Sequence, residues 1–192
     1  MKPNYIIFFD NDGVTSSWQT WGNKTYIKSL NPSIGDIDFY KWNTIDRLMD
    51  RISNEYDVIA ICISTWKQVL YDEDNIRDFT KFANLRRIKI ANDIQVASKF
   101  SYHEPWERLK VIKQGIKKYK PVDYIILEDE FGQSIENEGY HNVIKTDKLD
   151  GFCYKHFLEM GQIVDKWQLK EEYIKGKEKY EQALSTLLSC SI

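Results

Sequence analysis

The chain of 192 residues has few of the residues that mark several protein classes. Its three cysteines are scattered and odd in number, so they fit neither a disulfide framework nor a zinc cluster. Nine glycines and four prolines are too few for a collagen-like segment or a flexible linker. The length is too short for two ordinary domains. We therefore expect one domain with a substantial core, located in a reducing cytoplasm.

Net charge and long apolar runs are also lacking. The formal charge is −2, which argues against a generic nucleic-acid coat protein or a polybasic membrane binder. The longest apolar runs, 5–9 and 58–63, have the length of strands, whereas a membrane-spanning helix needs about 20 residues. The 42% of apolar and 14% of aromatic residues exclude intrinsic disorder. The composition predicts a soluble protein without a membrane partner.

Short apolar runs divide the chain into candidate strands. Runs rich in Ile and Phe are typical of strands buried on both faces, and they cover 5–9, 58–63, 124–127 and, more weakly, 142–145. Segments with helical periodicity lie between these runs. Strands that alternate with helices predict an α/β fold of three layers with a central parallel sheet. Residues 15–38 and 71–104 lack a clear pattern, and we expect insertions over the carboxyl edge of the sheet there.

Apolar residues three and four positions apart predict the helices. One helix is expected over 39–54, with Asp36 or Asp38 near its start. A second is expected over 105–119, where the apolar positions are Trp106, Leu109, Ile112 and Ile116. Two further helical stretches, 154–164 and 167–188, end the chain.

Acidic and hydroxyl residues follow the candidate strands directly. Because the carboxyl ends of parallel strands meet at one crevice, we expect these side chains to converge. Several carboxylates in one crevice repel each other unless a cation lies among them, and oxygen ligands without His or Cys favour Mg²⁺ over zinc. Taken singly, each residue also fits a turn or a helix cap. The residues concerned are Asp10, Asp12, Ser64, Thr65, Glu128 and Asp129.

Four stretches resemble the haloacid dehalogenase (HAD) superfamily. Residues 6–14, IIFFDNDGV, resemble its motif I, in which a hydrophobic strand precedes Asp-x-Asp-Gly. Residues 61–67, ICISTWK, are similar to motif II, and 124–129, YIILED, to motif IV. The stretch from 143 to 152 is similar to the closing strand and Gly-led helix of small HAD phosphatases. The variant is most like the HAD domains attached to RNA-repair and phage proteins.

The resemblance implies a phosphoaspartate mechanism with named roles. Asp10 would be the nucleophile, Asp12 the general acid and then the base, and Ser64 a hydrogen-bond donor to a phosphoryl oxygen. Mg²⁺ would be held by Asp10, by the backbone carbonyl of Asp12, and by Glu128 or Asp129. Glu128 departs from the commoner Asp of the family, which leaves open which of the two acids binds the metal directly.

A phosphate-binding cation is expected from the helix that precedes motif IV. Arg108 fits this position best, although Leu109 replaces the usual Gly and Val111 the usual Glu. Lys110 and Lys99 are the competing candidates for this role. The helix also carries a crowd of lysines, for which we favour a solvated face over contacts to a phosphate backbone; these are Lys110, Lys113, Lys117, Lys118 and Lys120.

The sequence thus predicts a single HAD-like domain over 1–192, with 165–192 as a C-terminal helical extension. The expected fold is a Rossmann-like HAD fold with a minimal cap, because the interval between motifs I and II leaves little room for a large one. The expected activity is Mg²⁺-dependent hydrolysis of a phosphomonoester on a small molecule, a nucleotide or a nucleic-acid end. A non-catalytic binding module and a metal-dependent nuclease are the alternatives, and the oligomeric state is left open.

Overall fold

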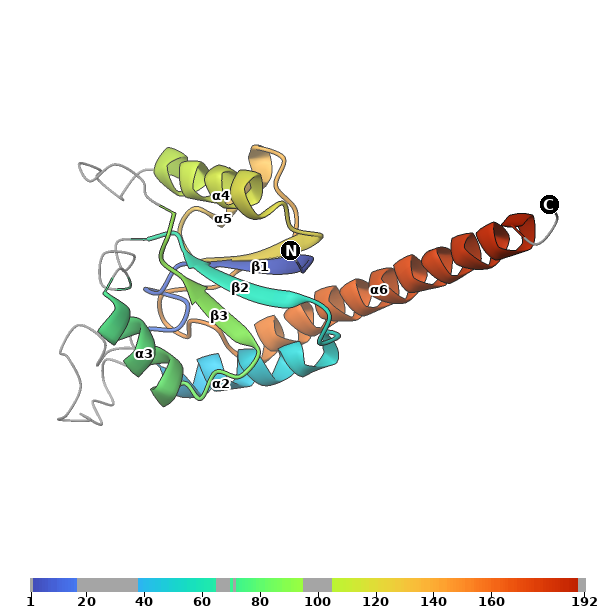
Figure 1. The fold of residues 1–192 in the computed structure, drawn as a ribbon. Helices are drawn as coiled ribbons and strands as arrows, with labels where there is room; N and C mark the ends of the chain where they lie inside the picture. The colour runs from blue at the N-terminus through green and yellow to red at the C-terminus, as the bar shows by residue number, and fades with distance from the viewer. Residues whose placement is uncertain (1, 17–37, 65–69, 71, 95–104, 190–192) are drawn as a thin grey trace.

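The computed structural model describes residues 2–16, 38–64, 70, 72–94 and 105–189. Strands and helices alternate along this part of the chain (Figure 1). In chain order the elements are β1 (Asn4–Phe9), α2 (Phe39–Leu48), the 3₁₀ turn η1 (Met49–Arg51), β2 (Asp57–Cys62), α3 (Glu73–Phe82), β3 (Ile88–Ala91), α4 (Pro105–Tyr119), β4 (Asp123–Glu128), α5 (Gly132–Asn137), β5 (Val143–Lys145) and α6 (Tyr154–Ser189).

The described strands form one parallel sheet in the order β3-β2-β1-β4-β5. Strand β1 lies at its centre, with β2 on one side and β4 on the other. The register places Phe9 opposite both Cys62 and Leu127, so that the residues that follow these three strands start at the same edge. The predicted α/β fold with a central parallel sheet is confirmed.

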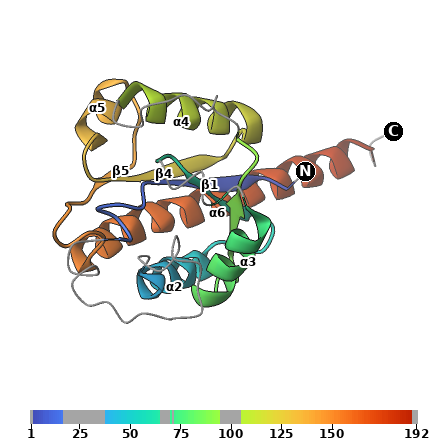
Figure 2. The ribbon, with the colours of Figure 1, turned by 90° about the vertical axis from the view of Figure 1, so that its left-hand side faces the viewer.

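Helices cover both faces of the sheet and make it the middle of three layers (Figure 2). All six residues of β1 are buried, as expected for a strand with helices on both sides. Tyr5, Ile7 and Phe9 pack into the cluster beneath α2, α3 and α6, whereas Ile6 and Phe8 pack toward α4 and α5. This alternation follows from the period of two in a β-strand.

Helix α2 begins where the sequence provides a cap. The Asp38 carboxylate accepts hydrogen bonds from the backbone N–H groups of Tyr40 and Lys41, which satisfies donors that the first turn leaves open. The predicted helix over 39–54 is too long, because regular α-helix ends at Leu48 and η1 follows. The apolar residues spaced three and four positions apart in this segment are all buried, namely Trp42, Ile45, Leu48, Met49 and Ile52.

The expectation of insertions over 71–104 is wrong for the described residues of that segment. They include α3, capped by the Asp72 carboxylate, and the edge strand β3, which pairs with β2. Only Ile88 of this strand is fully buried, and a four-residue edge strand carries too weak an apolar run to stand out in the sequence. Within α4, Trp106 is 45% exposed and does not belong to the buried face that its spacing suggested.

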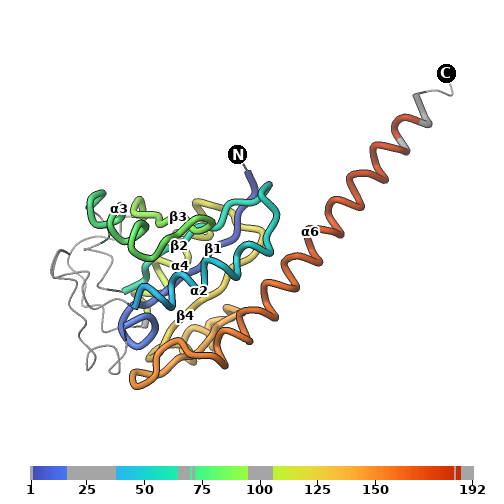
Figure 3. Tube along the Cα trace, turned by 90° about the horizontal axis from the view of Figure 1, so that it is seen from below, coloured from blue at the N-terminus to red at the C-terminus, as the bar shows by residue number. Residues whose placement is uncertain are grey.

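Helix α6 is one continuous element of 36 residues rather than the two stretches that the sequence suggested. Its first half packs on the sheet, where the Trp167 indole stacks on Tyr5 with ring centroids 4.3 Å apart. Its second half projects away from the sheet and its helices (Figure 3). Among the described helices, none combines the length and the apolarity needed to cross a membrane. The division into a domain over 1–192 with an extension at 165–192 stays a prediction.

Candidate active site

The register of the sheet assembles the site at the carboxyl ends of its three central strands. The Asp10 N–H donates to the carbonyl of Leu127 at 2.9 Å, and the Ile63 N–H donates to the carbonyl of Phe9 at the same distance. These two backbone bonds continue the ladder one step beyond the strands. Asp10 therefore lies between the end of β4, which carries Glu128, and the segment that carries Ser64.

Three carboxylates meet at this edge. Asp10, Glu128 and Asp129 each offer a carboxylate oxygen, and these oxygens all lie within 4.8 Å of one another. Asp10 and Glu128 are 2% and 0% exposed, so water screens their charges poorly. Both acids that the sequence left as alternatives, Glu128 and Asp129, thus lie beside Asp10.

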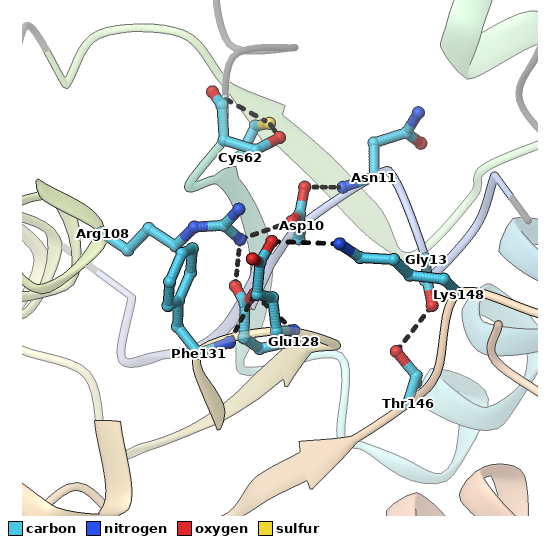
Figure 4. A network of polar contacts seen from close by, with 11 residues as sticks. Asp10, Asn11, Gly13, Cys62, Arg108, Glu128, Phe131, Thr146 and Lys148 are labelled. Carbon is cyan, nitrogen blue, oxygen red and sulfur yellow. Dashed lines mark hydrogen bonds and ion pairs between the residues drawn. The ribbon is translucent and has the colours of Figure 1, made fainter. Parts of the chain in front are cut away.

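Arg108 enters the cluster from the first turn of α4 (Figure 4). Its Nη1 forms ion pairs with Asp10 Oδ2 and Glu128 Oε2. The guanidinium lies over the Phe131 ring at 4.8 Å from the centroid, and its buried Nε has no hydrogen-bond partner among the described residues. A guanidinium carries five N–H donors, so Arg108 retains donor capacity for an anion that enters the site.

The competing cations lie elsewhere or outside the described residues. Lys110 Nζ lies over the Trp106 ring, 3.9 Å from its centroid, and Lys99 falls outside the described part of the chain.

The close approach of α4 to the sheet depends on Gly115, since a Cβ there would lie 2.7 Å from Phe8 Cε1. This small residue lets the helix that bears Arg108 lie against β1.

Burial and crowding alter the acidity of the cluster. Burial, followed by the charge of Asp10, raises the pKa of Glu128 to about 8, while Arg108 acts in the opposite direction. The same two causes raise the pKa of Asp129. One guanidinium is therefore insufficient to compensate three carboxylates in a buried site. The uncompensated negative charge of the cluster would stabilise an additional cation bound there.

A tight turn after β1 aligns the residues that follow Asp10. The Asn11 carbonyl accepts hydrogen bonds from the backbone N–H groups of residues 14, 15 and 16. Gly13 has a φ of +72°, and a Cβ on it would lie 2.0 Å from Asp129 Oδ2. The Thr146 hydroxyl donates to the Gly13 carbonyl at 2.7 Å. Glycine is required here both by the left-handed backbone and by the neighbouring carboxylate.

Ser64 and Asp12 follow the ends of β2 and β1. Ser64 is buried, and its Oγ lies 3.6 Å from Cys62 Sγ. Burial raises the pKa of the Cys62 thiol to about 12, so this thiol is not a nucleophile at neutral pH. Asp12 lies in the turn and forms an isolated bridge with Ser16. Its side chain is not part of the three-carboxylate cluster, and Thr65 lies outside the described residues.

The donor set fits a hard divalent cation. Three carboxylates, without His or Cys among them, supply the oxygen ligands that Mg²⁺ takes in proteins. Burial, and after it the charge of Asp10, raises the pKa of both Glu128 and Asp129, and a divalent ion would offset both causes. The residues that would hold it are Asp10, Glu128 and Asp129.

A comparison with models of protein families shows to which family this chain is related. Residues 6–157 match the model described as the HAD domain in Swiss Army Knife RNA repair proteins. The chain belongs to the HAD superfamily. The match begins within β1, covers the other described strands of the sheet and ends within the first turn of α6. No curated protein and no solved structure matches the chain.

Membership in the HAD superfamily confirms the resemblance found in the sequence. It makes the protein a HAD-type phosphohydrolase at the level of the superfamily. The acid cluster lies where its motif I and motif IV strands end. Sequence reasoning missed the Phe131 ring beneath Arg108 and the contact between Gly13 and Asp129. No local pattern marks either contact, because each joins residues far apart along the chain.

Proposed function

We propose that this HAD protein hydrolyses a phosphomonoester in a Mg²⁺-dependent reaction that passes through a phosphoaspartate on Asp10. The observation that carries the proposal is the convergence of Asp10, Glu128, Asp129 and Arg108 at one edge of the sheet. This arrangement supplies a nucleophile, a cation site and a fixed positive charge within one buried cluster.

Asp10 is the proposed nucleophile. In the first step a bond forms between an Asp10 carboxylate oxygen and phosphorus as the bond between phosphorus and the leaving oxygen breaks. Asp12 donates a proton to that leaving oxygen. In the second step water attacks the phosphoaspartate, Asp12 takes a proton from the water, and inorganic phosphate leaves with Asp10 regenerated.

Arg108 and Ser64 are the proposed phosphate-binding groups. Arg108 already contacts Asp10, and its Nε–H, which has no partner in the described part of the chain, is the proposed donor for a phosphoryl oxygen. The Ser64 hydroxyl is a second donor from the end of β2. Fixed donors that face a phosphoryl group stabilise the charge it carries during transfer.

The proposed metal ligands are Asp10, Glu128 and Asp129, with the backbone carbonyl of Asp12. When bound, Mg²⁺ supplies positive charge that offsets the repulsion between the carboxylates and the incoming phosphoryl group. We propose a nucleotide or a nucleic-acid end as the substrate, which the family description, naming RNA repair proteins, supports. A reducing cytoplasm is the proposed location, supported by the free thiols of Cys62 and Cys153.

The deciding experiment measures hydrolysis of para-nitrophenyl phosphate with and without Mg²⁺. The native protein should be active only with the metal, and Asp10→Asn should lose the activity while retaining its unfolding midpoint. Asp50→Asn is the matched control, because Asp50 is exposed on η1 and should leave the rate unchanged. Beryllofluoride should be retained on Asp10 in the native protein.

Two outcomes would replace the proposal. Absence of turnover on every phosphomonoester tested, with intact folding, would indicate a binding module. Cleavage of phosphodiesters by the native protein without retention of beryllofluoride would indicate a nuclease that acts without a covalent step.

A further inference from the structure

The solvent face of α4 combines positive charge with an exposed aromatic ring. Trp106, Lys110, Lys113 and Lys117 follow one another at spacings of four, three and four residues, which places them on one side of the helix. All four side chains are exposed. We name these four residues the basic stripe. The opposite side of the helix is buried through Val111 and Ile112.

Helix α4 has a single acidic residue, Glu107, which is 1% exposed, whereas the lysines of the stripe lie on the solvent face. Lys118, beside the stripe, is paired with Asp93 at 2.7 Å, whereas Lys113 and Lys117 form no ion pair among the described residues. In a protein with a formal charge of −2, the basic stripe is a local concentration of positive charge.

The basic stripe begins in the first turn of α4, the turn that also carries Arg108. Arg108, whose guanidinium pairs with Asp10 and Glu128, lies between Trp106 and Lys110 in the sequence. From Lys110 to Lys117 the helix rises about 10 Å, away from the carboxyl edge of the sheet (Figure 1). Because Arg108 and the stripe lie on different sides of α4, a chain of phosphates on the stripe passes over the first turn of the helix to bring its end to the three-carboxylate cluster.

Trp106 gives the stripe a preference for unpaired bases. Its indole is 45% exposed and is held by Lys110 Nζ, which lies 3.9 Å from the ring centroid. A cation against an aromatic ring restrains both side chains. An exposed indole beside lysines is the combination that binds single-stranded nucleic acid, since the ring stacks on a base while the ammonium groups contact phosphates.

We infer that the basic stripe binds the backbone of a single-stranded nucleic acid whose phosphorylated end enters the active site. The inference rests on the proposed phosphatase function for the fate of that end, but the binding itself does not require turnover. Positive charge alone fits any polyanion, and the position of Trp106 at the end of the stripe nearest Arg108 favours an unpaired strand.

The test measures binding of a labelled, 3′-phosphorylated single-stranded oligonucleotide by fluorescence anisotropy, without divalent metal so that the strand stays intact. The variant Lys110→Gln/Lys113→Gln/Lys117→Gln should bind more weakly. Its plot of log affinity against log salt should have a slope smaller by about 2, because each contact to a single-stranded phosphate contributes about 0.7. Trp106→Ala should weaken binding about tenfold with the slope unchanged.

The matched control removes the same charge from α6. Lys166→Gln/Lys177→Gln/Lys179→Gln replaces three exposed lysines on the far side of the sheet and on the projecting half of the helix, and the salt slope should remain that of the native protein. Equal slopes for the two triple variants would overturn the inference. Tighter binding of duplex, or of anionic phospholipid vesicles, through the same three lysines would overturn it as well.

Kinetics separate this inference from the proposed function. The α4 triple variant should hydrolyse para-nitrophenyl phosphate at the native rate and the phosphorylated oligonucleotide with about tenfold lower kcat/KM. If the triple variant loses binding and the native protein hydrolyses neither substrate, the role of the basic stripe is supported and the phosphatase proposal is refuted. If the native protein hydrolyses the oligonucleotide and the triple substitution leaves that rate unchanged, the phosphatase proposal is supported and the role of the basic stripe is refuted.

Discussion

The two helical layers of this protein differ in what they contribute. The layer of α2, α3 and α6 buries the larger cluster, which includes the fully buried Trp42 and Trp167. The layer of α4 and α5 buries a smaller, mainly aliphatic cluster. The smaller layer nevertheless brings Arg108 into the site. The comparison indicates that one face of the sheet supplies most of the stability and the other positions the chemistry.

The layers also differ in how their solvent faces are used. On α4 the exposed side chains form the basic stripe. The exposed side chains of α6 include charges of both signs and large apolar residues such as Leu169, Tyr173 and Tyr180. Substitutions in the layer of α2, α3 and α6 should therefore change stability, and substitutions in the layer of α4 and α5 should change rates and binding.

The largest expected effect is on stability. Trp42 is fully buried, with its ring centroid 4.7 Å from that of Phe9 and 5.3 Å from that of Phe79. Trp42→Ala should lower the free energy of unfolding by about 3–5 kcal/mol, measured by urea denaturation. The activity per folded molecule should be unchanged. Tyr40→Ala on the same helix, at a side chain that is 79% exposed, should change stability by less than about 0.5 kcal/mol.

The next effect is on catalysis. Arg108→Gln should reduce kcat/KM for para-nitrophenyl phosphate about 10²–10³-fold, because the fixed charge that faces Asp10 and the phosphoryl group is lost. Lys118→Gln, at the exposed end of the same helix, should keep the native rate. Similar rates for Arg108→Gln and the native protein would show that α4 does not position the chemistry.

A pair of glycine substitutions separates backbone strain from damage to the site. Gly13 and Gly139 both have positive φ, but only Gly13 has a carboxylate where a Cβ would lie. Each change to Ala should cost about 1–2 kcal/mol of stability in thermal or urea unfolding. Gly13→Ala should in addition raise the Mg²⁺ concentration needed for half-maximal activity and lower the rate about tenfold to 100-fold. An equal loss of activity in Gly139→Ala would contradict this account.

The smallest effect concerns a surface contact within the stabilising layer. Arg51 Nη1 and Asp165 Oδ1, 2.7 Å apart, connect η1 to α6, with side chains 47% and 58% exposed. Asp165→Ala should cost about 1 kcal/mol or less, with a smaller cost at high salt, because solvent screens such pairs. Asp74→Ala, which removes the local pair with Arg77 on α3, is the control. A loss above about 2 kcal/mol would show that this pair does more than join two exposed surfaces.

Elements with a strong local signal were predictable. The runs at 5–9 and 124–127 have the density of apolar residues that a central strand needs, and both became inner strands of the sheet. Strand β3 and helix α5 were not predicted. Both are short and lie at or near the edges of the sheet, where only some of their residues are buried.

The candidate site was predictable as a set of residues but not as an arrangement. The positions of Asp10, Ser64, Glu128 and Asp129 after strands predicted a common edge, and the resemblance to HAD motifs suggested Arg108. The resemblance already favoured Arg108 over Lys110, and the structure adds that the two residues lie on different sides of α4. The spacing of apolar residues in α4 likewise did not predict that Trp106 is exposed.

By itself, the sequence determined the class of fold, the order of the central elements and the residue types at the strand ends. These depend on local spacing, and spacing is fixed by the chain. The tertiary structure alone decided that Arg108 contacts Asp10, why position 13 must be glycine and that the basic stripe lies on a different side of α4 from Arg108. Those facts depend on contacts between residues about a hundred positions apart, which exist only after the helices pack on the sheet.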